Sequence, residues 1–205
     1  FPYTTLFRSN FLNLSDNNIS SEGSRYLGEA LNENNVIIKL LLDNCDIKDE
    51  GIKFIGEALS KNTSIKTLSL RKNKIDNISS IGESLKVNTG LVDLDLSDNL
   101  ISKSLDSMGD GLKLNNTLEV LNLKQNKFSD EENSIRTLSM GLIVNTSLKE
   151  LNLSYNDIGT EGIINIGGLF TNNTGIKKLD ISYDGIGDIG GCFIADYMTN
   201  NTTIE

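Results

Sequence analysis

Short apolar pairs recur along the chain at a nearly constant distance, and mostly polar stretches separate them. The two members of a pair flank one residue, as in Leu121-Asn122-Leu123. Because successive side chains of a strand point to opposite faces, this spacing predicts short strands that bury both apolar residues on one face. Successive pairs begin 26 to 30 residues apart, at Leu12, Leu40, Leu68, Leu94, Leu121, Leu151 and Leu179.

A polar position follows each pair at a fixed distance. Three residues after the second apolar residue come Asn17, Cys45, Asn73, Asn99, Asn126, Asn156 and Asp184. A buried side-chain amide at this position can satisfy backbone groups where the chain turns away from the strand, so stacked copies are expected to form a ladder. We interpret Cys45 as a member of this ladder, and not as a nucleophile.

The second half of each unit has a helical period. Gly51, Ile55, Ala58 and Leu59 fall on one helical stripe, and the other units have similar stripes. The helices are predicted to end at asparagines in the left-handed conformation. These asparagines are Asn34, Asn62, Asn88, Asn115, Asn145, Asn172 and Asn200. The third unit lacks a glycine at its helix entry (75–78), and the fifth has an insertion (130–135), so both should differ locally.

A strand this short and a helix of about ten residues bury their apolar faces only when such units stack. The sequence therefore predicts an α/β solenoid with an inner parallel β-sheet and an outer layer of helices. The pattern L-x-x-L-x-L-x-x-N/C-x-L resembles the ribonuclease-inhibitor-like class of leucine-rich repeats, as found in NOD-like receptors and Ran GTPase-activating proteins. The resemblance covers residues 11–205. It implies a horseshoe whose concave sheet face and rims bind another protein.

The repeats begin after a segment of different character. Residues 1–9 (FPYTTLFRS) resemble the translation of a sequencing adapter, so we expect them to be an artefact and not native sequence. Residues 10–205 are predicted to form seven repeats. Both ends of this array are expected to be truncated, which leaves a lost signal peptide as an open alternative.

Composition excludes several classes of function. A net charge of −9 is unfavourable for general binding to nucleic acid or anionic membranes. Histidine is absent, which removes Ser-His-Asp and HExxH sites. Cys45 and Cys192 lie in the second and seventh repeats, too far apart for a disulfide. We therefore expect no enzyme activity, no cofactor and no metal, and a reducing, cytoplasmic location.

One motif resembles a nucleotide site. Gly185-Ile-Gly187-Asp-Ile-Gly190 matches G-x-G-x-x-G between a strand and a helix. The same positions of the sixth repeat carry Gly159 and Gly162, so we interpret the match as a feature of the repeat.

The concave face carries the candidate binding residues. Asp93 and Asp95 should have only Thr67, Ser69, Val120 and Asn122 beside them, whereas Asp43 should pair with Arg71, and Glu150 with Lys178. Tyr155 and Tyr183 should stack on the rim. The candidate partner-binding residues are Asp93, Asp95, Arg71, Lys124, Tyr155 and Tyr183.

The leading hypothesis is a protein-interaction scaffold, with the identity of its partner left open. Two more specific alternatives are the regulatory repeats of a Ran-type GTPase-activating protein and the sensor repeats of a NOD-like receptor. The two aspartates could also be merely solvated or could bind a cation, although EF-hand spacing is missing.

Overall fold

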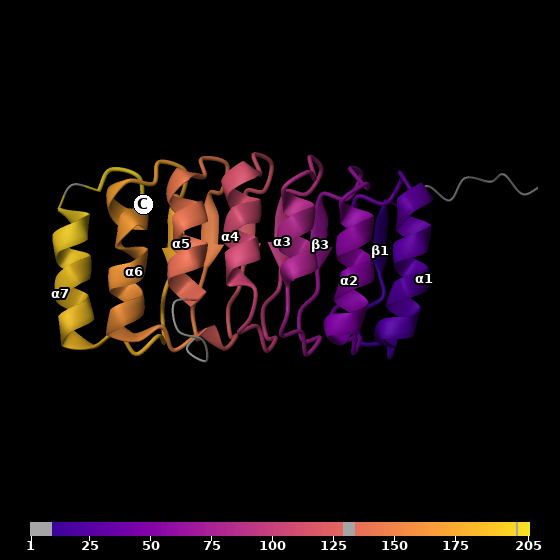
Figure 1. Ribbon diagram of the computed structural model, residues 1–205, viewed down its shortest axis with the longest axis horizontal. Helices are drawn as coiled ribbons and strands as arrows, with labels where there is room; N and C mark the ends of the chain where they lie inside the picture. The colour runs from indigo at the N-terminus through magenta and orange to yellow at the C-terminus, as the bar shows by residue number, and fades with distance from the viewer. Residues whose placement is uncertain (1–9, 129–133, 200) are drawn as a thin grey trace, which may run out of the picture.

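Strands and helices alternate along the chain in a single layered array (Figure 1). The computed structural model describes residues 10–128, 134–199 and 201–205. Residues 1–9 and most of the insertion at 130–135 lie outside these residues, so the two predictions made for them stay predictions. The strands are β1 (Phe11–Asn13), β2 (Lys39–Leu41), β3 (Thr67–Ser69), β4 (Asp93–Asp95), β5 (Val120–Asn122), β6 (Glu150–Asn152) and β7 (Lys178–Asp180). The helices are α1 (Ser20–Glu33), α2 (Lys48–Leu59), α3 (Ser79–Leu85), α4 (Leu105–Leu114), α5 (Ser134–Val144), α6 (Gly159–Thr171) and α7 (Gly187–Met198).

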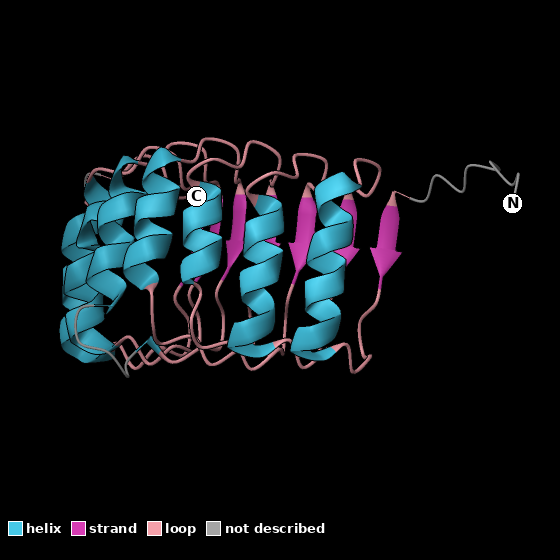
Figure 2. Cartoon of the chain, turned by 45° about the vertical axis from the view of Figure 1, so that its right-hand side comes forward, coloured by secondary structure: helices cyan, strands magenta, loops and turns pink. Residues whose placement is uncertain are grey.

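The strands form one parallel sheet in chain order, from β1 to β7. The register pairs equivalent residues of neighbouring repeats, for example Leu68 with Leu94 and Leu94 with Leu121. The predicted alignment of the strand leucines is thus confirmed. The helices cover one face of the sheet (Figure 2). The opposite face, which we call the open face, is the one that the sequence predicts as concave.

The core fills the space between the sheet and the helices. The strand leucines Leu40 and Leu42 are completely buried, and so is Ile55 of α2. The same pattern repeats along the array, so each unit buries its apolar side chains against the units on both sides. The apolar side chains of the two end repeats are less completely buried, and Leu12 and Leu179 are only partly buried.

The predicted ladder at the strand-to-helix turns is confirmed. The Asn73 side chain donates to the Leu42 carbonyl (2.7 Å) and accepts from the Cys45 amide (2.9 Å). The Asn99, Asn126 and Asn156 side chains bond in the same manner. Cys45 is also a ladder member, because its thiol donates to the Leu14 carbonyl at 3.3 Å. Burial raises the pKa of this thiol, which fits a structural role.

The left-handed conformation predicted for the helix-end asparagines is wrong. Asn34 and Asn115 have extended backbones, and the described members of this set have no positive φ. Their side chains instead form a second ladder at the helix-to-strand turns. Asn115 donates to the Leu85 and Asn88 carbonyls of the previous repeat and accepts from the Thr117 and Leu118 amides. In the last two repeats the ladder residues are Asn173 and Asn201, one position after the predicted ones.

One set of left-handed residues lies at the strand-to-helix turns, three positions after the end of each strand. They are Asp16, Asn44, Lys72, Asp98, Gln125, Tyr155 and Tyr183, with φ between 51° and 62°. Except at Tyr183, the amide at this position donates to a carbonyl of the next repeat, as Gln125 does to Ser154. The left-handed conformation thus recurs at this position with residues of different types.

The third repeat differs locally, as the sequence predicts. Its helix α3 has only seven residues. Asn77, in the segment without the entry glycine, forms an isolated parallel bridge with Lys103 of the fourth repeat. In this repeat an extended segment thus precedes the short helix α3.

Glycines bring neighbouring helices into close contact. A Cβ atom at Gly141 of α5 would overlap the Gly109 carbonyl oxygen of α4. A Cβ at Gly111 of α4 would likewise overlap the Gly82 carbonyl of α3. At these contacts the helix backbones touch directly, and no side chain separates them.

Asp184 is the carboxylate of the first ladder, where most repeats have an asparagine, and this difference supports a testable prediction. Its Oδ1 accepts from the Asn156 amide (2.7 Å), but its buried Oδ2 has no hydrogen-bond partner among the described residues. Burial raises the pKa of this carboxyl, although three backbone amides oppose the shift. The ionised form is therefore disfavoured in the folded protein, and the resulting loss of stability develops as pH rises through the folded pKa.

Asp184→Asn should accordingly stabilise the protein at neutral pH by about 1–3 kcal/mol, because the amide can donate where Oδ2 cannot. Urea unfolding of both proteins across the acidic-to-neutral range would measure this gain. It should shrink as pH falls through the folded pKa, where the native carboxyl becomes neutral. A lower stability of the Asp184→Asn protein at neutral pH would contradict this interpretation.

Candidate functional site

The open face is polar and carries mainly short side chains at its centre. Each strand places the residues on either side of its buried leucine on this face. On β3 to β6 these residues include Thr67, Ser69, Asn122 and Asn152, all partly or fully shielded by their neighbours. The centre of the face is therefore a shallow surface on which only a few groups carry charge.

Asp93 and Asp95 lie on β4, near the middle of the sheet. Their strand neighbours are Thr67 and Val120 for Asp93, and Ser69 and Asn122 for Asp95, as predicted. Asp95 accepts hydrogen bonds from the Ser97 amide (2.8 Å) and the Asn122 side chain (3.1 Å).

Asp93 differs from Asp95 in the surroundings of its side chain. The Asp93 backbone amide donates to the Lys66 carbonyl, but its carboxylate forms no hydrogen bond or ion pair with any residue that the structure describes. Burial raises the pKa of the Asp93 carboxyl, and the charge of Asp95 raises it further, while Lys39 opposes the shift. A half-buried carboxylate without a local counter-charge thus lies near the centre of the open face.

Arg71 and Asp43 interact electrostatically, as predicted, but they do not form a direct ion pair. The Arg71 guanidinium forms its ion pair with Asp98, which raises the pKa of Arg71. Asp43 instead accepts from the Ser69 hydroxyl and the Arg71 amide. The Asp43 carboxylate therefore accepts hydrogen bonds from the end of β3 and from the turn that follows it. The Arg71 guanidinium extends to the next repeat. Arg71 also interacts electrostatically with Asp95, so Asp95 is partly compensated, contrary to the sequence-based expectation.

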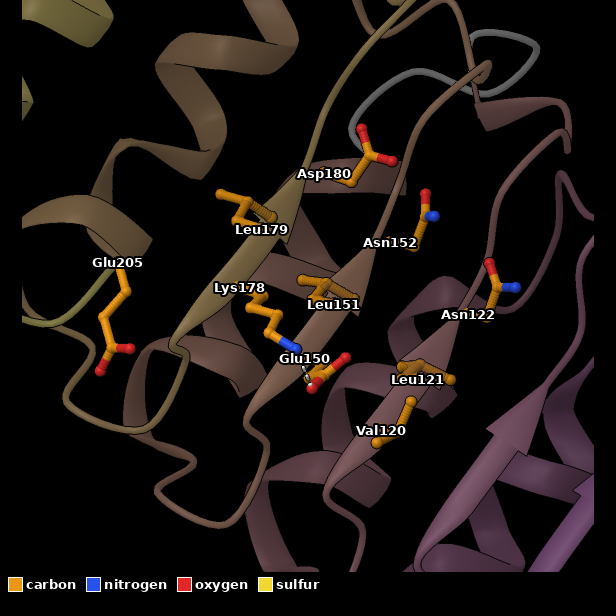
Figure 3. Close-up of a pocket in the computed structure, with 10 residues that line it drawn as sticks. All are labelled: Val120, Leu121, Asn122, Glu150, Leu151, Asn152, Lys178, Leu179, Asp180 and Glu205. Carbon is orange, nitrogen blue, oxygen red and sulfur yellow. Dashed lines mark hydrogen bonds and ion pairs between the residues drawn. The ribbon is translucent and has the colours of Figure 1, made fainter.

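The predicted pairing of Glu150 with Lys178 is confirmed, with Nζ and Oε1 2.7 Å apart. These two side chains line a hollow of about 370 Å³ on the open face, over β5 to β7. Figure 3 shows Asn122, Asn152 and Asp180 in one row across the successive strands of this hollow. The sequence places these residues on the correct face, but no feature of their type marks them as lining a hollow.

Tyr155 and Tyr183 stack as predicted, on the turns that follow β6 and β7. Their ring centroids are 4.3 Å apart and the ring planes differ by 14°. The Lys124 ammonium lies over the Tyr155 ring, 4.9 Å from its centroid. Both tyrosines have a left-handed backbone, with φ of 62° at Tyr155 and 58° at Tyr183. Tyr183 is 74% exposed, compared with 40% for Tyr155.

The six candidate residues thus form two groups. Asp93, Asp95 and Arg71 lie on and beside β4, whereas Lys124, Tyr155 and Tyr183 lie on the turns beyond β5 to β7. Across the described parts of the chain, no three His, Cys, Asp or Glu residues are grouped so that they could hold a metal ion. Both cysteines are free thiols, Cys45 buried and Cys192 exposed. No helix in the described ranges is long and apolar enough to cross a membrane.

Comparison with known proteins identifies similar repeats. A family model described as "Leucine Rich repeat" matches residues 10–28, 61–78, 114–131 and 144–167. A search of curated proteins gives no match.

Two solved structures share the fold. The tropomodulin C-terminal domain of Caenorhabditis elegans is 19% identical, with a TM-score of 0.51, and the match covers 66% of this chain and 83% of that domain. Leiomodin-1 Actin-Binding Site 2 is 20% identical, with a TM-score of 0.53, and the match covers 85% of this chain and 86% of the other.

Proposed function

We propose that this chain, whose repeats match a leucine-rich repeat family model, is a protein-binding scaffold whose partner lies along the open face of the sheet. The observation that carries this proposal is the Asp93 carboxylate, which is half-buried near the centre of that face without a counter-charge. Folding does not benefit from such a group. A basic side chain of a partner would compensate the negative charge of Asp93. The bound partner would also shield Asp93 and the residues around it from water.

The charge of the whole chain supports the same kind of partner. A net charge of −9 attracts basic proteins at a distance and speeds their association at low ionic strength. The hollow over β5 to β7 adjoins the strand that carries Asp93, so a bound segment can extend along the sheet from one to the other. The free thiols Cys45 and Cys192 fit a reducing compartment, and we propose a cytoplasmic role.

The experiment is a comparison of partner recovery between Asp93→Asn and a matched control. Asp110→Asn removes the same charge from the exposed surface of α4, on the other side of the molecule. The immobilised chains would be incubated with cell extract at low and moderate salt, and with purified actin because leiomodin-1 is described as an actin-binding protein. We expect Asp93→Asn to lose a partner that Asp110→Asn retains, with the difference shrinking as salt is raised.

Equal recovery by both variants at low salt would reject the open face around Asp93 as the binding surface. Recovery that changes equally in both would indicate only an effect of net charge.

Asp93→Asn should not lower the stability of the chain, which separates binding from folding. The pKa of Asp93 is raised in the folded protein, so its ionised form destabilises the fold at neutral pH. We expect a small gain in unfolding free energy at neutral pH that disappears as pH falls through the folded pKa. Thermal and urea unfolding would measure it, and a clear loss of stability would show that Asp93 has a structural role.

A further inference from the structure

Several asparagines of the second ladder stand in a sequon, the sequence pattern that accepts N-linked glycans. A sequon is Asn-x-Ser/Thr with any residue except proline in the middle, and the glycan is attached to the side-chain nitrogen of the asparagine. The ladder asparagines that stand in a sequon are Asn62, Asn115, Asn145 and Asn201. The pattern therefore coincides with residues that join neighbouring repeats.

In the interior repeats the fold uses both hydrogens of this side-chain nitrogen. Nδ2 of Asn62 donates to the Leu31 and Asn34 carbonyls, both at 2.8 Å. The Asn115 and Asn145 side chains form the same two bonds to the repeat before them. A glycan would replace one of the two hydrogens, so one buried carbonyl would lose its donor.

The ladder also has no room for a sugar. Asn62 and Asn115 are 6% exposed, and Asn145 is 3% exposed. A glycan is larger than any side chain and strongly hydrated, so it cannot be buried between two repeats. Because each repeat is stabilised through its neighbours, a glycan at any of these residues would separate the array into parts that do not bury their cores.

We propose that this chain folds only where its ladder asparagines are not N-glycosylated, and that it acts in a compartment without this modification. The ladder imposes this limit whichever partner the open face binds. Asn18 and Asn172 also stand in sequons, but their side chains are exposed. A glycan at either of these two residues would leave the ladder intact.

A sequon on the open face adds to this limit. Asn152 is followed by Leu153 and Ser154, and its side chain lines the hollow over β5 to β7 (Figure 3). Its Oδ1 accepts from the Ser154 amide at 3.0 Å, whereas its Nδ2 has no hydrogen-bond partner among the described residues. A glycan at Asn152 would leave the ladder intact but would fill the hollow, so it would block the proposed binding face.

The test expresses the chain in eukaryotic cells, with and without an added signal peptide. A ladder variant removes the sequons of the ladder but keeps the asparagines, through Ser64→Ala, Thr117→Ala, Ser147→Ala and Thr203→Ala. This variant should fold, because two other repeats have a glycine at the same position and need no hydroxyl there. The Gly90 and Gly175 amides still donate to the side chains of the ladder residues Asn88 and Asn173.

The matched control carries Asn18→Gln and Asn172→Gln, which remove two exposed acceptors and leave the ladder sequons in place. Without the signal peptide all three proteins should fold alike, as measured by circular dichroism and thermal unfolding. With it, mass spectrometry should find glycans on ladder asparagines of the unsubstituted chain, which should be retained in the cell unfolded. The ladder variant should be recovered as folded protein in at least about fivefold higher yield, and the control should behave as the unsubstituted chain.

A secreted and folded unsubstituted chain would overturn the inference, whether Asn62, Asn115 and Asn145 carry glycans or are empty. Tunicamycin, which blocks glycan transfer, provides a second measurement if the alanine substitutions themselves destabilise the ladder variant. It should restore folding of the unsubstituted chain in the secretory pathway, and rescue by neither treatment would also reject the inference. These outcomes do not depend on Asp93, whose substitution tests the proposed function.

Discussion

Asn115→Ala should lower the free energy of unfolding by roughly 2–4 kcal/mol, whereas Asn116→Ala, one residue further, should change it by less than about 0.5 kcal/mol. The Asn115 side chain is 6% exposed and bonds four backbone groups, namely the Leu85 and Asn88 carbonyls and the Thr117 and Leu118 amides. Alanine leaves these groups buried without partners. Asn116 has the same chemistry but is exposed.

Urea unfolding followed by circular dichroism would compare the two variants. Asn115→Asp is a useful third protein, because it keeps the size and the acceptor but loses the donating amide. Its cost should be at least that of alanine. If Asn115 and Asn116 proved equally tolerant of alanine, the second ladder would not contribute to stability.

Leu94→Ala should cost about 2–5 kcal/mol, the range for a fully buried leucine in a rigid core. Leu94 is completely buried and lies between Leu68 and Leu121 in the sheet. Among the described residues, Leu12 has a strand neighbour on one side only, and it is partly exposed. The equivalent change at Leu12 should therefore cost less than about half as much.

Chemical denaturation of both variants would test this gradient. An unchanged denaturant slope for Leu94→Ala would show that the array still unfolds as one unit. A cost for Leu12→Ala equal to that of Leu94→Ala would contradict an array in which each repeat is stabilised by its neighbours on both sides.

The strands and their register could be predicted because period-two burial depends only on local alternation. Leu94 and Leu121 lie in register since their repeats place them at the same point of the strand. The first ladder was predictable for a related reason, because its position follows the strand at a constant distance. Both features are encoded within a single repeat.

The role of the helix-end asparagines could not be inferred in this way. An asparagine after a helix suits a left-handed cap as well as a buried ladder, and only the carbonyls of the previous repeat decide between them. The ion pair of Arg71 has the same ambiguity. Asp43 and Asp98 lie in the repeats on either side, and the backbone amide that occupies Asp43 is visible only in three dimensions.

The glycine contacts between helices have a consequence for the shape of the open face. In a stack of repeats, the difference in spacing between the outer and inner layers determines how strongly the array bends. Direct contact between the backbones of α4 and α5 at Gly109 and Gly141 keeps the outer spacing small, and so does the contact between Gly82 and Gly111. A larger residue at Gly141 would push the helices apart and increase the bend. The curvature of the open face, and so the space that it offers to a partner, thus depends on glycines in the helix layer. In the proposed complex the partner does not touch that layer.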